Sequence, residues 1–299
     1  MKRFLIIPLL VLCSSKALFA ETFSDDMGRL VEIKENPSRI VSLAPHITEI
    51  LFALDLGKKV VGVTQYSDYP EEARNKERVG SYVKLNLEKI VSLSPDLVLA
   101  TADGNPKAVV DRLGSIGIPV YVVNAGGIKD IYGNIRSIGI VTGKSKKADL
   151  IAEKLENRIN SVVDKVKKLA RPRVFIQLGY SPLYTAGKNT FVDDLITLAG
   201  GKNIAGKEKI SYPVYSTEEL LNKEPEVVFS VLMGSEVDIK TDTFWNQWHT
   251  LPAVRDGRIY YVDPDIVNRP SPRIAAGLEL LARKLHPGVF EDSGGKGDK

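Results

Sequence analysis

The sequence predicts an α/β protein of two similar, Rossmann-like lobes that are joined by one long α-helix. Two observations support this fold class. A helix-plus-strand pattern at residues 86–99 is repeated at residues 216–229, with one copy in each half of the chain. Between the copies, residues 145–170 contain no glycine or proline and place apolar residues at helical spacing. At 299 residues the chain is long enough for two lobes of ordinary size.

Each copy of the repeat has the pattern of one helix followed by one strand. It begins with a helix-capping residue, Asn86 or Ser216, and carries an acid two positions later, Glu88 or Glu218. An apolar helical stripe follows, then a proline and a short strand-forming run. Two such units predict two lobes that each present an acid at the start of a surface helix. Matched acids also suggest a protein that holds a ligand between its lobes and docks onto a two-fold partner.

Residues 1–20 have the features of a cleavable secretory signal peptide. Lys2 and Arg3 are basic, residues 4–12 are apolar, and Ala17-Leu-Phe-Ala20 is a cleavage pattern before Glu21. The apolar run is short for a membrane span, so a membrane anchor is the less favoured interpretation. We therefore expect an exported chain that begins at Glu21.

Removal of this leader would change the chemistry of the chain. Its one cysteine, Cys13, lies in the leader, so the mature chain would have no disulfide, thiolate nucleophile or iron–sulfur cluster. The leader also carries Lys2, Arg3 and Lys16 but no acid, so the formal net charge would fall from +4 to +1. A nearly neutral surface argues against nucleic acid as a partner.

The first lobe, residues 21–144, is predicted from strands that alternate with helices through short turns, as in a parallel α/β sheet. We expect Pro45 to end the first strand of this sheet. In chain order the expected segments are a hairpin at 23–33, a strand at 39–43, a helix at about 48–56, a strand at 60–63, the first repeat and a strand at 117–123.

The connecting helix is predicted at residues 145–171 and ends at Pro172. At 1.5 Å per residue it would be roughly 35–40 Å long. Because such a connector is stiff, we expect only small rotations of the lobes. The second lobe, residues 172–287, has strands expected at 173–178, 225–231 and 258–262, and the polar tail 288–299 is expected to be disordered.

Tyrosines gather in the loops that follow the predicted strands. A tyrosine offers a flat apolar face and a polar tip, which suits a large planar ligand rimmed with amides. For any single tyrosine, packing at the base of a loop is about as good an explanation. Together they favour a ligand cleft between the lobes, and no nucleophile motif or catalytic carboxylate pair accompanies them. The tyrosines concerned are Tyr66, Tyr69, Tyr82, Tyr180, Tyr184, Tyr212 and Tyr215.

The chain resembles the helical-backbone substrate-binding proteins of ABC importers, the class III periplasmic binding proteins, and within them the cobalamin-binding group. The resemblance extends over about residues 39–285. The segments that carry it are Arg39-Ile-Val-Ser-Leu-Ala-Pro45, Tyr66-Ser-Asp-Tyr-Pro70, Asn86-Leu-Glu88, Ser94-Pro-Asp-Leu-Val98 and Ser271-Pro-Arg273.

The resemblance implies a function in transport and not in catalysis. The chain would be a monomeric periplasmic protein that captures cobalamin or a related corrinoid, its transported ligand and not a cofactor, and delivers it to the permease dimer in the inner membrane. A ferric siderophore or haem receptor of the same fold is the alternative. A nitrogenase-like enzyme is less favoured because its clusters need cysteines. A ligand-free scaffold would leave the tyrosines unexplained.

Matching segments of the family imply which residues would form the site. The ligand positions are Tyr66, Tyr82, Tyr184, Tyr212, Asp265 and Arg269. Tyr82 and Tyr212 fall where the cobalamin-binding proteins carry tryptophan, which keeps ring stacking with less contact area. Glu88 and Glu218 match acids that dock onto arginines of the two permease subunits.

Simpler interpretations of the charged residues stay open. Asp265 can accept hydrogen bonds from ligand amides and Arg269 can donate to carbonyls, but the two can also merely pair with each other. Glu88 and Glu218 can be acids that favour a helix dipole and nothing more. Their equivalent placement in both lobes favours the docking hypothesis.

His46 follows Pro45 at the expected mouth of the cleft. Imidazole is a good cobalt ligand, so His46 is a candidate to coordinate the metal of a corrinoid. A solvated histidine at a helix start is the favoured interpretation on base rates. The other histidines, His249 and His286, are scattered, which disfavours a zinc or manganese receptor.

Overall fold

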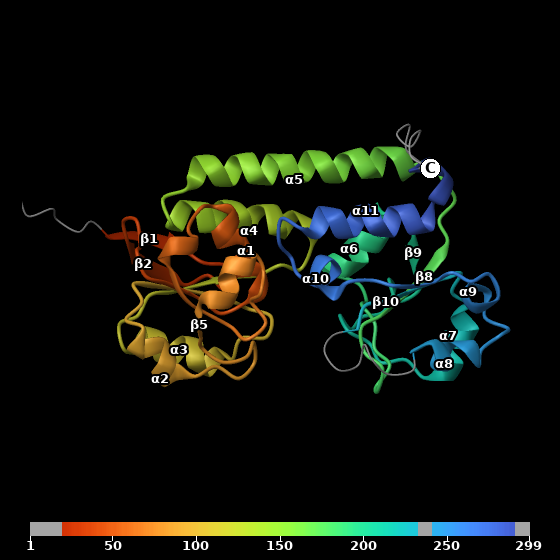
Figure 1. Ribbon diagram of the computed structural model, residues 1–299, viewed down its shortest axis with the longest axis horizontal. Coiled ribbons are helices and arrows are strands. Elements are labelled where there is room, and N and C mark those ends of the chain that lie inside the picture. Colours follow the sequence, from red (N-terminus) through yellow and green to blue (C-terminus); the bar gives the residue numbers. More distant parts are fainter. Residues whose placement is uncertain (1–19, 233–240, 291–299) are drawn as a thin grey trace, which may run out of the picture.

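Two parallel sheets, one in each lobe, form the frame of the molecule (Figure 1). The computed structural model describes residues 20–232 and 241–290, so residues 1–19 of the expected signal peptide and 291–299 of the expected tail lie outside the described residues. The first residues of the tail, expected to be disordered, instead continue a short 3-10 helix (Pro287–Val289), and Phe290 is buried. A long helix runs across both lobes and joins them. The predicted fold class of two similar α/β lobes with a helical connector is confirmed.

The N-terminal lobe contains a five-stranded sheet with the strand order β5-β4-β3-β6-β7, in which every pairing is parallel. The expected hairpin precedes it as β1 (Ala20–Ser24) and β2 (Leu30–Lys34). The sheet and its helices are β3 (Ile40–Ser42), α1 (Pro45–Ala53), β4 (Val60–Val63), β5 (Glu77–Arg78), α2 (Leu87–Ser92), β6 (Leu97–Thr101), α3 (Lys107–Ser115), β7 (Val120–Val123) and α4 (Ile128–Val141).

The C-terminal lobe repeats this plan with a four-stranded parallel sheet of order β11-β10-β8-β9. Its elements are β8 (Arg173–Gln177), α6 (Phe191–Leu198), β9 (Lys202–Asn203), α7 (Thr217–Lys223), β10 (Val227–Ser230), α8 (Thr241–Asn246), α9 (Pro252–Arg255), β11 (Ile259–Tyr261), α10 (Pro264–Val267) and α11 (Ile274–Leu285).

Helix α1 begins earlier than its sequence predicts. We expected Pro45 to end a strand and the helix to begin near residue 48, but Pro45 is the first residue of α1. Proline suits this position because its fixed φ matches the helix and its missing N–H would have no partner there. The earlier start brings His46 into the first turn of a buried helix, where it and Glu49 face other residues and not solvent.

Helix α5 (Ser145–Val166) is the long connector. Apolar residues at helical spacing, among them Ala152, Leu155, Ile159 and Val162, are buried on one face. That face packs against α4 of the first lobe and α11 of the second, and Figure 1 shows α5 lying above both. The helix ends at Val166, before the predicted limit at residue 171. Because it packs on both lobes, α5 limits how they can turn.

The repeat seen in the sequence is present in three dimensions. The side chains of Asn86 and Ser216 cap α2 and α7 by accepting from the backbone N–H groups of Lys89 and Glu219. Before each proline, a residue takes left-handed backbone angles, with φ of 46° at Ser94 and 45° at Glu224. The two copies therefore match down to the turn that ends the helix.

The repeat also extends to contacts that the sequence pattern did not reveal. Asp96 accepts from the backbone N–H of Arg39 at 2.8 Å, and Glu226 accepts from that of Arg173 at 2.8 Å. The guanidinium of Arg39 caps the end of α2, and that of Arg173 donates to the carbonyl of Glu224 after α7. Each lobe thus fixes its repeated helix to the start of its first parallel strand.

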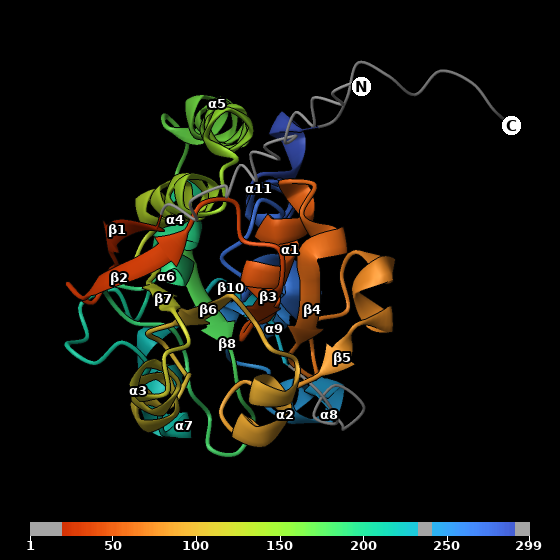
Figure 2. The same cartoon turned by 90° about the vertical axis from the view of Figure 1, so that its left-hand side faces the viewer.

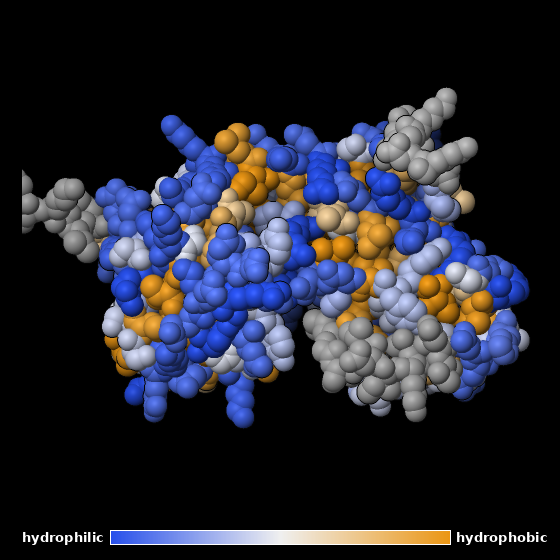
Figure 3. Space-filling view, in the orientation of Figure 1, coloured by the Kyte–Doolittle hydropathy of each residue, from blue (hydrophilic) through white to orange (hydrophobic). Residues whose placement is uncertain are grey.

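The repeated helices place the two lobes in similar orientations. Helices α2 and α7 both lie on the side of the molecule opposite α5, as the two views agree (Figure 1 and Figure 2). In the space-filling view the described surface is notched between the lobes on this same side (Figure 3). The notch, the repeated helices and the loops at the carboxyl ends of the strands together define the candidate functional surface.

Candidate functional site

The predicted tyrosines follow strands of both sheets. Tyr66 lies in the loop after β4, Tyr82 after β5 and Tyr184 after β8, whereas Tyr212 lies in the long loop before α7. In parallel α/β sheets, ligands bind at the carboxyl ends of strands, because the loops there are free to vary while the strands hold them in place. The tyrosines therefore stand where such a fold places a ligand.

Tyr82, Tyr184 and Tyr212 form one cluster from the two lobes. The Tyr82 hydroxyl donates to the carbonyl of Asp103. Burial raises the pKa of Tyr82, and the nearby Asp103 and Tyr212 raise it further. Burial also raises the pKa of Tyr212 to about 12, with smaller contributions from Asp103 and Tyr184. The influence of Tyr212 on Tyr82 and the shared influence of Asp103 place these two side chains near each other across the lobe boundary, and both hydroxyls stay protonated at neutral pH.

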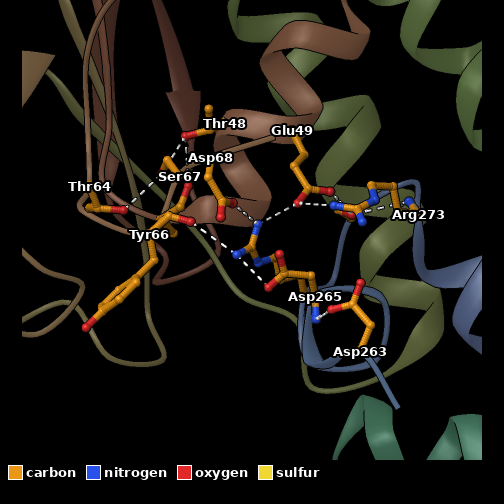
Figure 4. Close-up of polar contacts among 12 residues, drawn as sticks. Thr48, Glu49, Thr64, Tyr66, Ser67, Asp68, Asp263, Asp265 and Arg273 are labelled. Atoms are coloured by element: carbon orange, nitrogen blue, oxygen red, sulfur yellow. Dashed lines mark hydrogen bonds and ion pairs between the residues drawn. The ribbon is translucent and has the colours of Figure 1, made fainter. Parts of the chain in front are cut away.

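Tyr66 is placed differently. The residue is 58% exposed, and Figure 4 shows its ring turned away from Asp68 and Glu49. Its backbone carbonyl, in contrast, accepts a hydrogen bond from Arg269 of the other lobe at 3.1 Å. Electrostatic influence thus links Tyr82 to Tyr212 and Tyr212 to Tyr184, whereas Tyr66 is exposed.

Two glycines that the sequence reading did not single out support the tyrosine rings. A Cβ added at Gly104 would overlap the Tyr82 ring, and one added at Gly179 would overlap the Tyr184 ring. Gly104 also has a φ of +101°, which side-chain-bearing residues rarely adopt. Each ring therefore lies directly on the backbone that follows a strand. Isolated glycines just after strand patterns were the available signal for such close approach.

The guanidinium of Arg269 joins the lobes, because it binds acids of both. Nη1 lies 3.1 Å from Oε1 of Glu49 and 2.9 Å from Oδ1 of Asp68, both in the N-terminal lobe. Nη2 lies 2.6 Å from Oδ1 of Asp265. The simpler interpretation, that Asp265 pairs with Arg269, is thus observed, but the pair is part of a larger inter-lobe network.

Glu49 is the centre of this network, and the sequence reading missed it. Its residue is only 4% exposed, and its Oε2 accepts from the hydroxyl of Ser271 at 2.6 Å. Its Oε1 accepts from Arg269 and, at 3.3 Å, from Arg273. Burial raises the pKa of Glu49, while Ser271 and the two arginines oppose that rise. An acid inside the apolar pattern of α1 was the signal, because a buried charge requires partners.

His46 is buried, so the favoured interpretation of a solvated histidine is wrong. It is 5% exposed, because α1 begins at Pro45 and carries His46 into its packed first turn. Burial lowers the pKa of His46 to about 3, and the charge of Arg269 acts in the same direction. Its Nε2 atom has no hydrogen-bond partner within the described structure. A neutral imidazole with a free nitrogen keeps the chemistry of a metal ligand, but in this arrangement its burial shields it from a cleft ligand.

Glu88 and Glu218 occupy equivalent exposed positions in the first turns of α2 and α7. Neither carboxylate has a hydrogen-bond or ion-pair partner among the described residues. In α7 the neighbouring Glu219 closes the capping box with Ser216, which leaves Glu218 free to face solvent. The two acids therefore occupy matching helices, one on each lobe, on the side of the molecule opposite α5.

Within residues 20–232 and 241–290, no group of three or more histidine, cysteine, aspartate or glutamate residues could hold a metal ion. No helix in the described part of the chain is long and apolar enough to cross a membrane.

Two hollows lie away from the notch. One of about 310 Å³ lies between the N-terminal hairpin and the end of α4, where Phe23 and Val141 are among its lining residues. The other, of about 420 Å³, lies beside α11 and includes Tyr260 and Phe290. Neither is lined by the tyrosine cluster or by the Arg269 network, so neither defines the candidate site.

Comparisons with known proteins point to a family. The model of the family described as "Periplasmic binding protein" matches residues 40–266. The vitamin B12-binding protein of Vibrio parahaemolyticus is 33% identical over 245 residues, which cover 82% of this chain and 88% of that protein.

Solved structures give a similar result. The periplasmic vitamin B12 binding protein BtuF of Vibrio cholerae superposes with a TM-score of 0.77 at 32% identity, covering 86% of this chain and 99% of that one. The periplasmic heme-binding protein RhuT from Roseiflexus sp. RS-1, in apo form, has a TM-score of 0.77 at 28% identity, covering 84% and 99%.

Proposed function

The chain belongs to the periplasmic binding protein family, and from that premise we propose that it captures cobalamin or a related corrinoid between its lobes. It then delivers this ligand to the permease of an ABC importer in the inner membrane. It acts as a monomeric receptor and not as an enzyme. Similarity to vitamin B12-binding proteins by sequence and by structure supports this choice of ligand.

One observation carries the proposal furthest, namely the cluster of Tyr82, Tyr184 and Tyr212 contributed by both lobes. Flat aromatic faces suit a broad planar ligand, and protonated hydroxyls suit one whose rim offers amide oxygens. A ligand that contacts both lobes also stabilises one relative orientation of them. Capture and the setting of the lobe angle would therefore be one event.

The charges near the cleft favour an uncharged, amide-bearing ligand over an anionic one. Arg269 is already engaged by Glu49, Asp68 and Asp265, so it offers little positive charge to a ligand. Asp103 adds a further acid beside Tyr82 and Tyr212. An anionic siderophore would meet repulsion here, whereas side-chain amides can donate to these carboxylates.

Haem is the second candidate, because a haem-binding protein superposes well on this chain. A tyrosine can be a haem iron ligand, but it then binds best as the phenolate. The raised pKa values of Tyr82 and Tyr212 make that deprotonation more costly. Haem propionates would also face the acidic surroundings of Arg269. Both features favour the corrinoid.

A titration tests the proposal. Purified mature protein is titrated in a calorimeter with cyanocobalamin, haemin and a ferric siderophore. We expect one cyanocobalamin per protein and a higher melting temperature, since ligand at one hundred times its Kd stabilises the native state by about 2.7 kcal/mol. Heat with haemin or the siderophore but none with cyanocobalamin would show that the cargo is misassigned.

Matched tyrosine variants locate the site. Tyr82→Ala and Tyr212→Ala should each weaken cyanocobalamin binding about ten-fold or more, in line with the roughly 1–3 kcal/mol that stacking contributes per ring. Tyr260→Ala, a tyrosine beside α11 and outside the cleft, is the control and should bind as the wild type does. Equal affinities in all three variants would place the ligand elsewhere.

A further inference from the structure

The segment Ser271-Pro-Arg273, which the sequence singled out as a family signature, contacts the opposite lobe and not the tyrosine cluster. Ser271 and Arg273 both bind Glu49 of α1, and Arg269 binds the same carboxylate. We call these four residues, Glu49, Arg269, Ser271 and Arg273, the Glu49 lock. It connects a helix of the N-terminal lobe with the loop between α10 and α11 of the C-terminal lobe.

The lock is built as a buried, saturated site. The side chains of Glu49 and Arg269 are 2% and 12% exposed, and Ser271 is fully buried. Both oxygens of Glu49 have partners from the other lobe, which a buried carboxylate needs in order to remain charged. If the lobes separated at this point, Glu49 would lose these partners and its buried negative charge would be left uncompensated.

The partners of Glu49 are themselves held in place. The guanidinium of Arg273 lies 4.0 Å above the ring of Tyr69, a residue of the loop after β4. The Ser271 hydroxyl also accepts from the backbone N–H of Arg273 at 3.2 Å. These contacts fix the direction from which the C-terminal lobe meets α1. The lock therefore determines the angle between the lobes as well as their closeness.

Arg269 connects the lock to the binding surface. The same guanidinium that binds Glu49 donates to the carbonyl of Tyr66 and binds Asp68, in the loop that forms the rim of the cleft (Figure 4). A change in the position of Arg269 would therefore move that loop relative to the C-terminal lobe. Glu49 can therefore act on the Tyr66 loop through this arginine.

We propose that Glu49 is a positioning residue for ligand capture, which fixes the resting angle between the lobes and holds Arg269 against the Tyr66 loop. This inference rests on the proposed function for its ligand-binding part only. The lock sets the two halves of the cleft close to their ligand-bound arrangement before the ligand arrives. Closure of the lobes on the ligand then costs little of the binding free energy.

The lock predicts a specific phenotype for Glu49→Gln. Without the negative charge, Arg269 and Arg273 retain Asp68, Asp265 and Tyr69 as partners, but no charged group of α1 holds them. The ligand-free lobes should sample a broader range of angles. If about one tenth of the molecules remain in the binding arrangement, the apparent Kd for cyanocobalamin rises about ten-fold.

The lobe angle can be measured without any ligand. Cysteines introduced at the exposed positions Arg112 on α3 and Asn222 on α7 carry spin labels, and they are the only thiols once Cys13 is removed with the leader. Double electron–electron resonance then gives the distribution of distances between the two labels. It is measured for the wild type, for Glu49→Gln and for the control Glu32→Gln, which changes an exposed acid of β2. We expect a broadened or shifted distribution for Glu49→Gln alone.

Cyanocobalamin binding completes the test. Saturating ligand should return the Glu49→Gln distribution to that of the wild type, at an apparent Kd about ten-fold higher. An unchanged ligand-free distribution would overturn the lock, and a changed distribution with unchanged affinity would overturn the positioning role. If the wild type binds no cyanocobalamin, the proposed ligand fails while the distances still decide whether the lock exists.

A milder variant keeps the lock testable if Glu49→Gln does not fold. Ser271→Ala removes one hydrogen bond to Glu49 and leaves all the charges in place. It should broaden the distance distribution in the same direction as Glu49→Gln but by less. A Ser271→Ala distribution identical to that of the wild type, with Glu49→Gln unable to fold, would contradict the lock as the determinant of the angle.

Discussion

Two polar residues in the first turns of α1, His46 and Glu49, illustrate how burial decides the chemistry of single side chains. Glu49 meets two arginines and a serine, and it can therefore be buried as part of a network. His46 meets no hydrogen-bond partner at Nε2 within the described structure and avoids the cost of a buried charge by remaining neutral. The same helix face thus carries one paired acid and one uncharged base.

The buried His46 predicts a loss of stability in acid. Its pKa is about 3 in the folded state against an ordinary 6.5. Between these values the unfolded chain binds a proton that the folded chain does not. The free energy of unfolding therefore falls as the pH falls, by about 1.4 kcal/mol for each pH unit from this residue. Urea unfolding of wild type and His46→Gln over this pH range should show a shallower pH dependence in the variant.

The exposed His249 provides the control for this measurement. His249→Gln should leave the pH dependence of the unfolding free energy as it is in the wild type. A His46→Gln protein whose stability falls with acid as steeply as that of the wild type would show that His46 is accessible to protons in the folded chain.

Gly104 predicts a residue-level effect on binding. In Gly104→Ala the new methyl group would overlap the Tyr82 ring, and the backbone angle there disfavours a side chain. We expect a loss of about 1–3 kcal/mol in stability and a displaced ring that binds cyanocobalamin more weakly. Calorimetric titration and urea unfolding measure the two effects.

Gly114 in α3 is the matched position, because a Cβ there meets nothing within 4 Å. Gly114→Ala should stabilise the helix by about 0.5–1 kcal/mol and leave ligand affinity unchanged. If both alanine variants bind cyanocobalamin equally well, the Tyr82 ring does not contact the ligand.

At the scale of elements, the repeated units α2–β6 and α7–β10 present the matched acids Glu88 and Glu218 to solvent. Helices of this length gain only modestly from an acid in their first turn, about 0.3–1 kcal/mol. In α7 the capping role belongs to Glu219, which accepts from Ser216 at 2.8 Å. Glu218 is thus available for a partner, and such exposed charges act mainly on orientation and association rate.

Variants of these two adjacent glutamates should therefore distinguish an effect on docking from an effect on stability. Glu218→Ala should weaken binding to the permease, most strongly at low salt, and should change the unfolding free energy by less than about 0.5 kcal/mol. Glu219→Ala should cost about 1 kcal/mol of stability through the lost cap and leave docking intact. Surface plasmon resonance on the immobilised permease and urea unfolding provide the readouts. Docking that is equally sensitive to both residues would contradict the assignment.

Much of the architecture could be predicted at this scale, because local patterns determine it. The hairpin, the repeated helix-plus-strand units and α5 all follow from apolar spacing and caps within short segments. The start of α1 could not, since Pro45 serves equally well as a strand end or a first helical residue. The short strands β5 and β9 depend on their neighbours in the sheet and left no pattern of their own.

The candidate site was less predictable because it joins distant parts of the chain. Tyr82, Tyr184 and Tyr212 could be proposed from the rule that loops at the carboxyl ends of strands carry the ligand site. The contact between Glu49 and Arg269 spans 220 residues of sequence, and no local pattern connects them. The burial of His46 likewise follows from the start of α1 at Pro45, which the sequence left open.

At the scale of the whole molecule, α5 and the Glu49 lock constrain the same motion from different places. Helix α5 packs on both lobes on one side of the molecule (Figure 1), and the lock joins them through α1. Helices α2 and α7 lie on the other side, one on each lobe (Figure 1). Ligand capture should therefore change the distance between these helices only slightly, which keeps Glu88 and Glu218 at a nearly constant spacing.

The most direct test of this account is a crystal structure of the protein with cyanocobalamin. We expect a single corrin ring in the notch between the lobes, in contact with Tyr82 of one lobe and Tyr212 of the other, while Glu49 and Arg269 remain paired. A ligand bound to the outer face of one lobe, or one that leaves both tyrosines uncovered, would contradict the central claim that the two lobes together bind one planar ligand.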